Sequence, residues 1–412
     1  MKRAILPAEA SAEALDAMTA EDASSRAPVG VGRRSFLKGI GAAGMAVSAG
    51  TVLASRLLAD SITDPDHSGE LPKGDAAILR FLAAAEILET DLWLQYAELG
   101  GVQDDEVAKR ASQNIPGYPA TSTGGNTPYT NDLIQLDGDM PQYILDNTDD
   151  ELSHELFINA YLASKGADTV NMDRFRILPS SKADGANRIG RLTNLMQLTV
   201  DTSFWTRYRS DSANPDLGGS FASAIPTLAV NQHPAIPRDN GDLNEPFLQV
   251  IANTAGFHFA FIEQGGSSLY PQLAQRVTHV EVLRILLSIG GTEITHFQTW
   301  HDKAGNAPTR LDVADPKHPG VMVSFPNLNQ PPAGFNLEDV QTNLIMPEPT
   351  VFLNKKFPTV SIIRPTATKG AAMGAVRSLV ADGLFIGQTK EFFEFLQDLA
   401  AEADAARGGL MK

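Results

Sequence analysis

Residues 149–156 read DDELSHEL, and within them His154 follows Glu151 by three positions. Residues three apart on an α-helix lie on nearly the same side, one turn along, so this carboxylate and this imidazole would point to one place. The same spacing recurs in Glu293-Ile-Thr-His296. Composition alone would give about 0.4 such pairs in 412 residues with 8 His and 19 Glu. The repetition therefore favours a shared role over two charge pairs on solvated helix surfaces.

Four segments have the three- and four-residue apolar spacing that predicts helices with one buried side. A glycine pair closes the first segment and Pro246 opens the third, as is typical of helix ends. The connection between the second and third segments is long enough to recross the domain, and we expect a further helix in residues 186–209. The four segments are residues 74–100, 141–165, 246–270 and 278–302.

The rest of the chain has weaker patterns. Residues 55–73 lack periodicity and are typical of a linker. Residues 303–368 are rich in Pro and Asn, which predicts an irregular extension with short strands, and residues 369–412 return to a helical pattern broken near 383–387. If the second helix starts late, the acidic run at 146–150 would form its first turn, because carboxylates suit the positive end of the helix dipole.

The first and third helices each offer a glutamate on the buried side. Glu86 and Glu89 are alternatives in the first helix, whereas Glu263 is the sole glutamate between Pro246 and His279. Glu263 follows a very apolar run, where an unpaired charge is costly and bound cations would offset that cost. A carboxylate can bridge two cations and a histidine can bind one, so four such helices would form most of a dinuclear site.

The chain order Glu, Glu-x-x-His, Glu, Glu-x-x-His resembles the ferritin-like di-metal carboxylate superfamily. AAEILETDLWLQY at 84–96 and FIEQGGSSLY at 261–270 are similar to helix motifs of bacterial ferritin-like proteins related to plant desiccation-related proteins. The resemblance covers residues 74–302. It implies an all-α fold, a ferritin-like four-helix bundle with a long crossover between the second and third helices and additional C-terminal helices.

The resemblance also implies a ligand set for two iron or two manganese ions. The leading glutamate of the first-helix motif is the ligand in that family, which favours Glu86 over Glu89. The implied roles are Glu86 and Glu263 as terminal ligands, Glu151 and Glu293 as bridges, and His154 and His296 as one nitrogen ligand to each metal. Carboxylate and imidazole sites accept both iron and manganese, so the sequence does not select the metal.

Three classes of activity are compatible with such a site. The first is an oxidoreductase acting on dioxygen or peroxide, either ferroxidase-like or manganese-catalase-like. The second is a non-enzymatic metal-binding or desiccation-related structural protein of the cell envelope. The third, oxygenation of a small organic substrate, requires an apolar access tunnel. The large insertions between helices argue against a 24-subunit ferritin cage.

Composition restricts the chemistry further. The chain has no cysteine, which excludes disulfides, thiolate zinc sites, iron–sulfur clusters and a rubredoxin-like electron donor. With 33 Lys+Arg against 49 Asp+Glu the net charge is −16, and no basic block long enough to follow a phosphate backbone occurs. We therefore expect no nucleic-acid partner.

The N-terminal region predicts export. RRSFLK at residues 33–38 precedes a Gly- and Ala-rich run at 39–54 and resembles a bacterial twin-arginine signal. That run is shorter than the roughly 20 residues that span a bilayer, so we expect no stable transmembrane segment after cleavage of residues 1–54. Ala59 is an alternative cleavage position. The expected partner is the Tat export machinery, and the expected location is periplasmic or secreted.

Several other histidine, aromatic and acidic side chains lie within the predicted helices. We expect His258 and His301 to be packing or surface residues, because single histidines without a spaced partner rarely form sites. Tyr96, Tyr161 and Trp300 lie at core positions of their predicted helices and are expected to pack there. A hydrogen bond from one of them to a metal ligand is the alternative. Glu155, next to His154, is expected to face solvent.

Overall fold

The structure of the chain is a computed structural model, and it describes residues 70–103, 124–207, 221–305, 310–328, 356–360 and 370–406. The predicted signal peptide at 1–54 and most of the predicted linker lie outside the described residues. In the described part the protein is mostly helical. Among these residues no helix combines the length and apolar character that a bilayer crossing requires.

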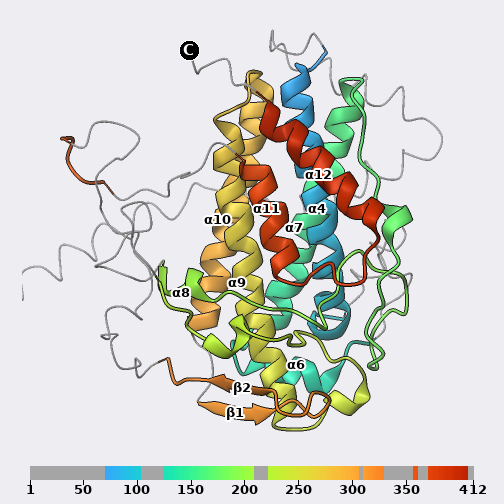
Figure 1. The fold of residues 1–412 in the computed structure, drawn as a ribbon, viewed down its shortest axis with the longest axis vertical. Helices are drawn as coiled ribbons and strands as arrows, with labels where there is room; N and C mark the ends of the chain where they lie inside the picture. The colour runs from blue at the N-terminus through green and yellow to red at the C-terminus, as the bar shows by residue number, and fades with distance from the viewer. Residues whose placement is uncertain are drawn as a thin grey trace, which may run out of the picture. The chain divides into compact units, whose positions relative to one another are not determined.

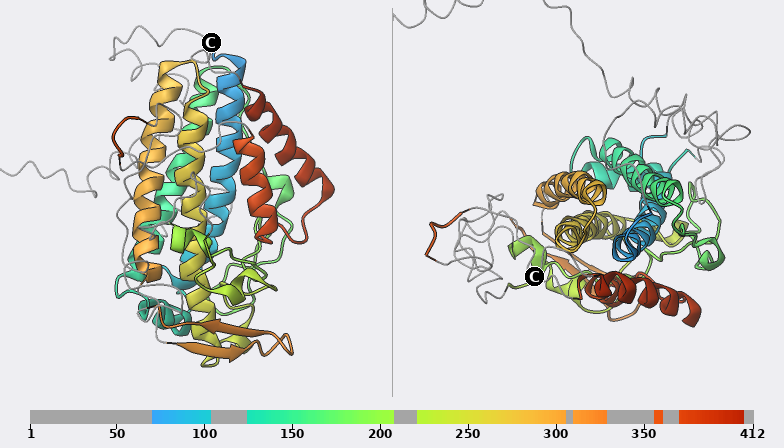
Figure 2. Two further views of the ribbon diagram at one scale, coloured as in Figure 1. Left: turned by 60° about the vertical axis from the view of Figure 1, so that its left-hand side comes forward. Right: turned by 90° about the horizontal axis from the view of Figure 1, so that it is seen from above.

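Four long helices lie side by side along the long axis (Figures 1 and 2). α4 packs mainly against α7, and α9 packs mainly against α10. Their bounds are α4 Lys73–Gly100, α7 Met140–Ser164, α9 Phe247–Ala274 and α10 Val280–Gly305. The apolar periodicity thus located all four, and the largest errors are at the C-terminal ends of α9 and α10, which continue past the predicted ends.

The chain direction follows from contacts at the two ends of the bundle. Asp75 at the start of α4 accepts hydrogen bonds from the backbone N–H groups of Thr278 and His279, between α9 and α10. At the other end, α6 (Thr127–Ile134) packs on α4, α7 and α9. α7 and α9 therefore run in the same direction, and the connection between them recrosses the bundle, as expected.

The predicted helix at 186–209 is wrong. Within the described residues 186–207 only α8, Ser203–Arg207, is helical, and Leu178 and Arg191 instead form an isolated bridge. The Asp91 carboxylate of α4 accepts hydrogen bonds from the backbone N–H groups of Leu192 and Thr193. These long-range bonds satisfy backbone groups that a helix would otherwise pair, so tertiary contacts override the local pattern.

The C-terminal part adds a hairpin and two helices. β1 (Leu311–Ala314) pairs antiparallel with β2 (Met322–Phe325), in agreement with the expected short strands. α11 (Ala371–Ala381) and α12 (Lys390–Ala405) pack against α9 and α4, respectively. The predicted break between them is present.

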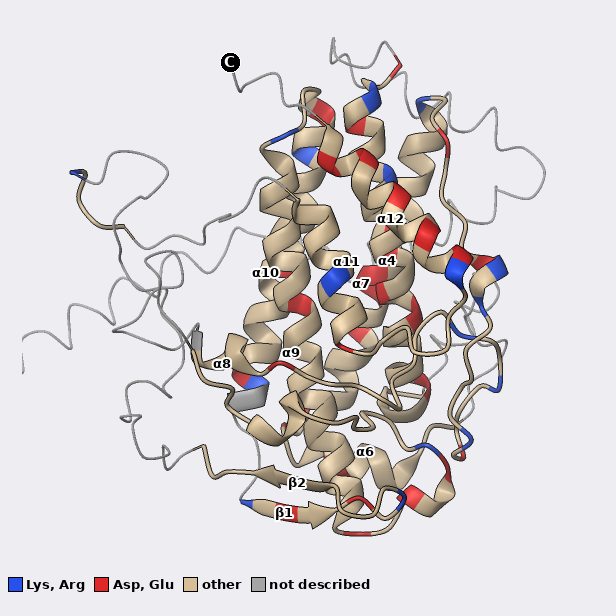
Figure 3. Ribbon diagram, viewed as in Figure 1, with Lys and Arg blue, Asp and Glu red and all other residues tan. Residues whose placement is uncertain are grey.

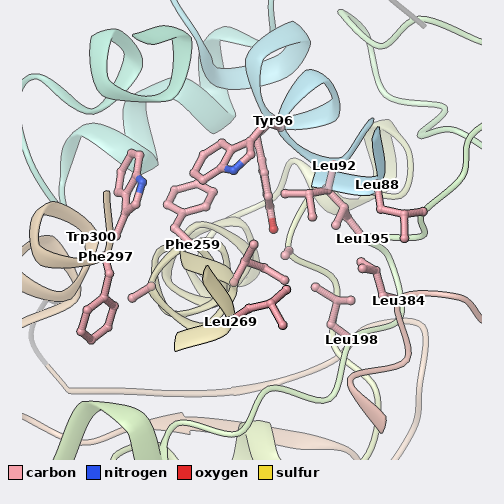
Figure 4. Close-up of a cluster of buried hydrophobic side chains, with 14 of the residues drawn as sticks. Leu88, Leu92, Tyr96, Leu195, Leu198, Phe259, Leu269, Phe297, Trp300 and Leu384 are labelled. Carbon is pink, nitrogen blue, oxygen red and sulfur yellow. The ribbon is translucent and has the colours of Figure 1, made fainter. Parts of the chain in front are cut away.

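α12 covers α4 with an apolar side and carries carboxylates on its outer side (Figure 3). Phe392 and Leu396 are buried, whereas Glu394 and Asp398 are exposed. The Thr389 hydroxyl caps its first turn by accepting from the Phe392 N–H. This amphipathic helix therefore closes one side of the bundle. Figure 4 shows a cluster of buried hydrophobic side chains in the core, among them Leu384 and Phe259.

Candidate metal centre

Six acidic and imidazole side chains from the four long helices meet inside the bundle. α4 contributes Glu86, α9 contributes Glu263, and α7 and α10 each contribute a Glu-x-x-His pair. All six are at least nine-tenths buried. The i,i+3 spacing places each pair on the inner side of its helix, as the sequence predicted. The six residues are Glu86, Glu151, His154, Glu263, Glu293 and His296.

The six side chains form two overlapping groups. One contains Glu86 and His154, the other contains Glu263 and His296, and both contain Glu151 and Glu293. Within each group, one potential ligand atom per residue lies within 4.8 Å of the others. The two residues expected to bridge are the two that the groups share. Each group therefore has the donor number and type that a cation of the iron or manganese class accepts.

Each imidazole faces several carboxylates through its Nδ1 atom. His154 Nδ1 lies 3.1 Å from Glu151, 3.3 Å from Glu293 and 3.4 Å from Glu86. His296 Nδ1 lies 2.8 Å from Glu151 and 3.3 Å from Glu263. One ring nitrogen carries at most one proton, so it cannot serve all these oxygens at once. Such convergence is typical of atoms arranged around a cation.

Buried oxygens of the cluster also have too few hydrogen-bond donors. Glu86 Oε2, Glu263 Oε2 and Glu293 Oε1 have only a histidine Nδ1 at 3.3–3.4 Å, which each shares with other carboxylates, and among the described residues Glu293 Oε2 has no hydrogen-bond partner. Buried polar atoms are normally paired, and leaving them unpaired is costly. Four carboxylates would also balance the charge of two divalent cations. Two bound metal ions would therefore both coordinate the unpaired oxygens and balance the charge of the carboxylates.

Neighbouring polar groups hold the ligand side chains in place. Asn147 donates to Glu151 and to Glu263, each over 2.9 Å, and its carbonyl accepts from the Trp300 indole N–H at 2.6 Å. Tyr270 donates its hydroxyl to Glu86 Oε1. Partners of this kind fix the direction of a ligand and strengthen metal binding.

Asp150 orients the second histidine. Its Oδ2 atom lies 3.1 Å from His296 Nε2, on the side of the ring away from the carboxylate group. A proton on Nε2 donated to Asp150 leaves the Nδ1 lone pair directed into the cluster, as a metal ligand requires. The late helix start that would place the acidic run 146–150 in the first turn does not occur, because α7 begins at Met140, close to the predicted residue 141, and Asp150 lies well inside the helix.

Burial and the close packing of the carboxylates shift several pKa values of the cluster upward, toward the protonated form. For Glu151 burial acts in the same direction, but the two histidines outweigh it and lower the pKa. Burial raises the pKa of Glu86 to about 6, against the lowering effect of His154. Burial also raises the pKa values of Glu263 and Glu293. For His154, burial acts to lower the pKa, but hydrogen bonds to the carboxylates outweigh it and raise the pKa above its ordinary value. Because metal ligands must be deprotonated, cation binding would displace these protons.

The structure distinguishes Glu86 from Glu89. Glu86 belongs to one of the two groups, whereas Glu89 belongs to neither. Glu89 nevertheless lies close to the cluster. Burial, followed by the charges of Glu151 and Glu263, raises the pKa of Glu89 well above its ordinary value. Both glutamates line a neighbouring cavity. Of the two alternatives left by the sequence, Glu86 is the one placed among the other five side chains.

A glycine gives Glu293 its space. A Cβ atom on Gly266 would lie 2.2 Å from Glu293 Oε2, whereas a Cβ on Gly265 would meet nothing within 4 Å. The close approach of α9 and α10 at this level therefore requires Gly266 specifically. The sequence shows the glycine pair but not which member contacts a site residue.

An apolar cavity of about 100 Å³ adjoins the cluster. It lies between α4, α9 and the C-terminal helices, where Phe81, Leu269 and Leu379 are among its apolar lining residues. Glu86 and Tyr270 form part of its wall on the cluster side. The C-terminal helices thus complete a space that reaches a member of the cluster.

The remaining sequence expectations have mixed outcomes. His258 and His301 are buried, with 0% and 1% exposure, and pack against aromatic rings. Glu155 is also buried, at 8% exposure, so the expectation that it faces solvent is wrong. It lies four residues after Glu151 and so shares the side of α7 that packs on α4. Burial raises the pKa of Glu155 to about 7.

Sequence reasoning missed three residues that contact the cluster: Asn147, Asp150 and Tyr270. Two helical signals were available, since Asn147 precedes Glu151 by four positions and Tyr270 follows Glu263 by seven.

Comparison of the chain with models of protein families, with curated protein sequences and with solved structures returned no match. The functional proposal therefore depends on the geometry of the cluster and on the sequence motifs.

Proposed function

We propose that this chain is a ferritin-like di-metal protein that binds two iron or two manganese ions and reacts with dioxygen or peroxide. One observation carries the proposal: six buried Glu and His side chains, in two groups sharing Glu151 and Glu293. Each group consists of three glutamates and one histidine, and two of the glutamates are common to both groups. A buried ion-pair network without a metal does not require this arrangement. The ferritin-like resemblance of the sequence motifs supports the same assignment.

In this proposal the residues around the cluster have separate tasks. Glu86 and His154 would hold one ion, Glu263 and His296 the other, and Glu151 and Glu293 both. Bound ions that change oxidation state supply the electrons for reduction of dioxygen or peroxide. Asn147 and Asp150 keep ligand atoms directed inward. Burial excludes bulk water from the reacting atoms, which strengthens the electrostatic interactions there.

Tyr270 has a distinct place at the edge of the site. Its hydroxyl donates to Glu86, and the tyrosine also lines the apolar cavity. Burial and the neighbouring carboxylates raise the pKa of Tyr270 well above its ordinary value, so the phenol keeps its proton. We assign it the role of holding Glu86 in its ligand position on the cavity side.

The arginine pair at residues 33–34 supports export as part of the proposal. A Tat substrate is folded before it crosses the membrane, so this protein would acquire its metal in the cytoplasm and act in the periplasm or outside the cell. The signal lies outside the described residues. A fusion of residues 1–60 to a reporter, with Arg33 and Arg34 both changed to Lys as the control, tests this part separately.

Elemental analysis, ferrous-oxidation and peroxide-decomposition assays test the main proposal. We expect about two ions per chain in the wild type and a clear loss in Glu293→Gln, because both groups lose a ligand. Glu281→Gln is a matched control on the same helix, because Glu281 contacts Lys165 and Tyr161 away from the cluster. Wild-type protein that binds no metal during purification or reconstitution contradicts the proposal. Two ions without either activity favour the non-enzymatic metal-binding alternative.

The apolar cavity favours a second candidate, oxidation of a small apolar organic molecule at the same ions. A cavity of about 150 Å³ with apolar walls holds a molecule of the size of benzene, so this one suits a somewhat smaller group. Gly265→Leu tests the candidate, because its side chain would enter open space at the cavity lining. A loss of metal-dependent oxidation of short alkenes, with peroxide decomposition unchanged, is the expected result. Equal loss of both reactions argues against a separate organic substrate.

A further inference from the structure

A row of aromatic rings leads from the metal cluster through the core. Trp300 of α10 stacks on Trp93 of α4 with ring centroids 5.3 Å apart, and Trp93 lies 5.7 Å from Tyr96. Phe259 packs against all three rings at 4.6–5.0 Å. Figure 4 shows Trp300, Phe259 and Tyr96 in the same cluster. All of these rings are at most 1% exposed, so the row is shielded from water.

One end of the row is joined to the candidate metal ligands. The Trp300 indole N–H donates to Asn147, and the amide of Asn147 donates to Glu151 and Glu263. A single side chain thus separates Trp300 from two members of the cluster. The contact is short and entirely buried, which are the conditions that favour electron transfer over a short distance.

The other end of the row terminates at a buried base. The Tyr96 hydroxyl lies 2.8 Å from His258 Nδ1, and His258 Nε2 lies 3.1 Å from Asp382 Oδ2. With the Nε2 proton directed to the carboxylate, Nδ1 is free to accept the phenolic proton. Burial raises the pKa of Tyr96 well above its ordinary value. The phenol therefore releases its proton to His258 readily only when an electron leaves with it.

We propose that Trp300, Trp93 and Tyr96 form a relay that moves one-electron oxidising equivalents from the metal cluster to Tyr96, with His258 as the proton acceptor. The inference rests on the proposed redox function of the cluster. Tyr96 loses one electron and its phenolic proton and becomes a neutral radical. The electron passes through Trp93 and Trp300 and reduces by one electron a cluster that dioxygen or peroxide has oxidised. The proton goes to His258 Nδ1, and Asp382 balances the resulting charge.

The polar partners explain why the oxidation would stop at Tyr96. The Trp93 indole N–H has no acceptor among the described residues, and that of Trp300 has only an amide oxygen, which is a poor base. An oxidised indole in either place keeps its proton and passes the charge on. Tyr143 also lies beside Trp300, but among the described residues its hydroxyl has no histidine or carboxylate partner that could accept the phenolic proton.

Flash photolysis of the metal-free full chain tests the relay without turnover. Because the chain has no cysteine, Gln142→Cys gives one attachment point for a ruthenium photosensitiser on exposed α7 surface. Tyr143→Phe in the same chain removes the neighbouring tyrosine. Photo-oxidation in the presence of an external electron acceptor is expected to give the absorption and EPR signature of a neutral tyrosyl radical. Deuterated water is expected to slow its formation.

Matched variants identify the radical site. Tyr96→Phe removes one oxygen and is expected to abolish the tyrosyl signal, and Trp93→Phe is expected to suppress it. Tyr129→Phe is the control, because Tyr129 is equally buried but donates to the Ala235 backbone carbonyl. An absent tyrosyl signal in the parent, or a signal unchanged by Tyr96→Phe, overturns the relay.

A second experiment connects the relay to the cluster. Protein loaded with Fe(II) under anaerobic conditions is mixed with dioxygen or hydrogen peroxide and frozen for EPR. A tyrosyl signal that Tyr96→Phe abolishes supports the proposal. Oxidation of the bound iron without a tyrosyl signal overturns the connection to the cluster. If neither iron nor manganese binds, the proposed function fails, and the flash experiment still decides whether the aromatic row transfers electrons.

Discussion

The two adjacent glycines of α9 allow a sharp test of the site. Gly266→Ala would place a methyl group 2.2 Å from Glu293 Oε2 and 3.0 Å from its carboxyl carbon. The obstructed atoms are the end of a flexible side chain, so Glu293 can turn away while the fold stays intact. Because Glu293 belongs to both groups, its displacement removes a ligand from each. Gly265→Ala is the matched control, with nothing within 4 Å of the new methyl group.

We expect Gly266→Ala to raise the free energy of unfolding of the metal-free protein and to lower that of the metal-loaded protein. Replacing a helix-interior Gly with Ala stabilises by about 0.5–1 kcal/mol, a gain that both variants share apart from the cost of turning Glu293. Metal at a hundred times its Kd adds about 2.7 kcal/mol of stability per site. Gly265→Ala should keep this increment. Gly266→Ala should lose most of it at both sites, about 5 kcal/mol in total.

Urea unfolding with and without metal, together with elemental analysis, measures these quantities. We expect Gly265→Ala to bind as much metal as the wild type and Gly266→Ala to bind little, with native helical circular dichroism in both. Full metal occupancy in Gly266→Ala would refute the placement of Glu293 in the site. Equal loss in Gly265→Ala would show that the helix backbone, and not Glu293, is the sensitive element.

Three further predictions concern single contacts. Asn147→Ala should weaken metal binding by about 10–100-fold in a metal titration, because Asn147 holds two ligands; unchanged affinity would exclude that role. Glu98→Ala leaves the buried Arg191 guanidinium without its carboxylate and should lower the free energy of unfolding in urea by about 3–5 kcal/mol. A decrease below about 1 kcal/mol would contradict a strong buried ion pair. Burial acts to raise the pKa of Asp315, but Arg238 lowers it from 3.8 to about 2. The ionised form therefore stabilises the fold by about 2 kcal/mol above pH ~4, and this is lost as the pH falls toward 2. Asp315→Asn should remove this acid-sensitive difference, and a parallel pH profile for variant and wild type would count against it.

The long helices were predictable because each has a wide apolar side that repeats every three to four residues over more than six turns. Periodicity also placed Glu151 with His154 and Glu293 with His296, since their relative direction is fixed within one helix. Periodicity could not decide whether Glu86 or Glu89 is the ligand from the first helix, because both side chains lie toward the interior. That choice depends on the rotation of α4 against α7, which only packing sets.

The errors have a common physical origin in contacts between distant segments. Residues 186–209 have some helical pattern, but Asp91 binds their backbone N–H groups from α4. The acidic run at 146–150 gave no indication that Asp150 contacts His296 of α10. The cavity depends on α11 and α12, more than a hundred residues away from Glu86 in sequence. Local propensity contains no information about such partners.

The central claim is a pair of ions that share two carboxylates. Anaerobic titration of the full chain with Mn(II), followed by EPR, tests it most directly. The account predicts about two Mn(II) per chain with the exchange-coupled spectrum of two ions bridged by Glu151 and Glu293, and loss of the coupling in Glu151→Gln. No tightly bound Mn(II), or a single uncoupled ion that Glu151→Gln leaves unchanged, would contradict it.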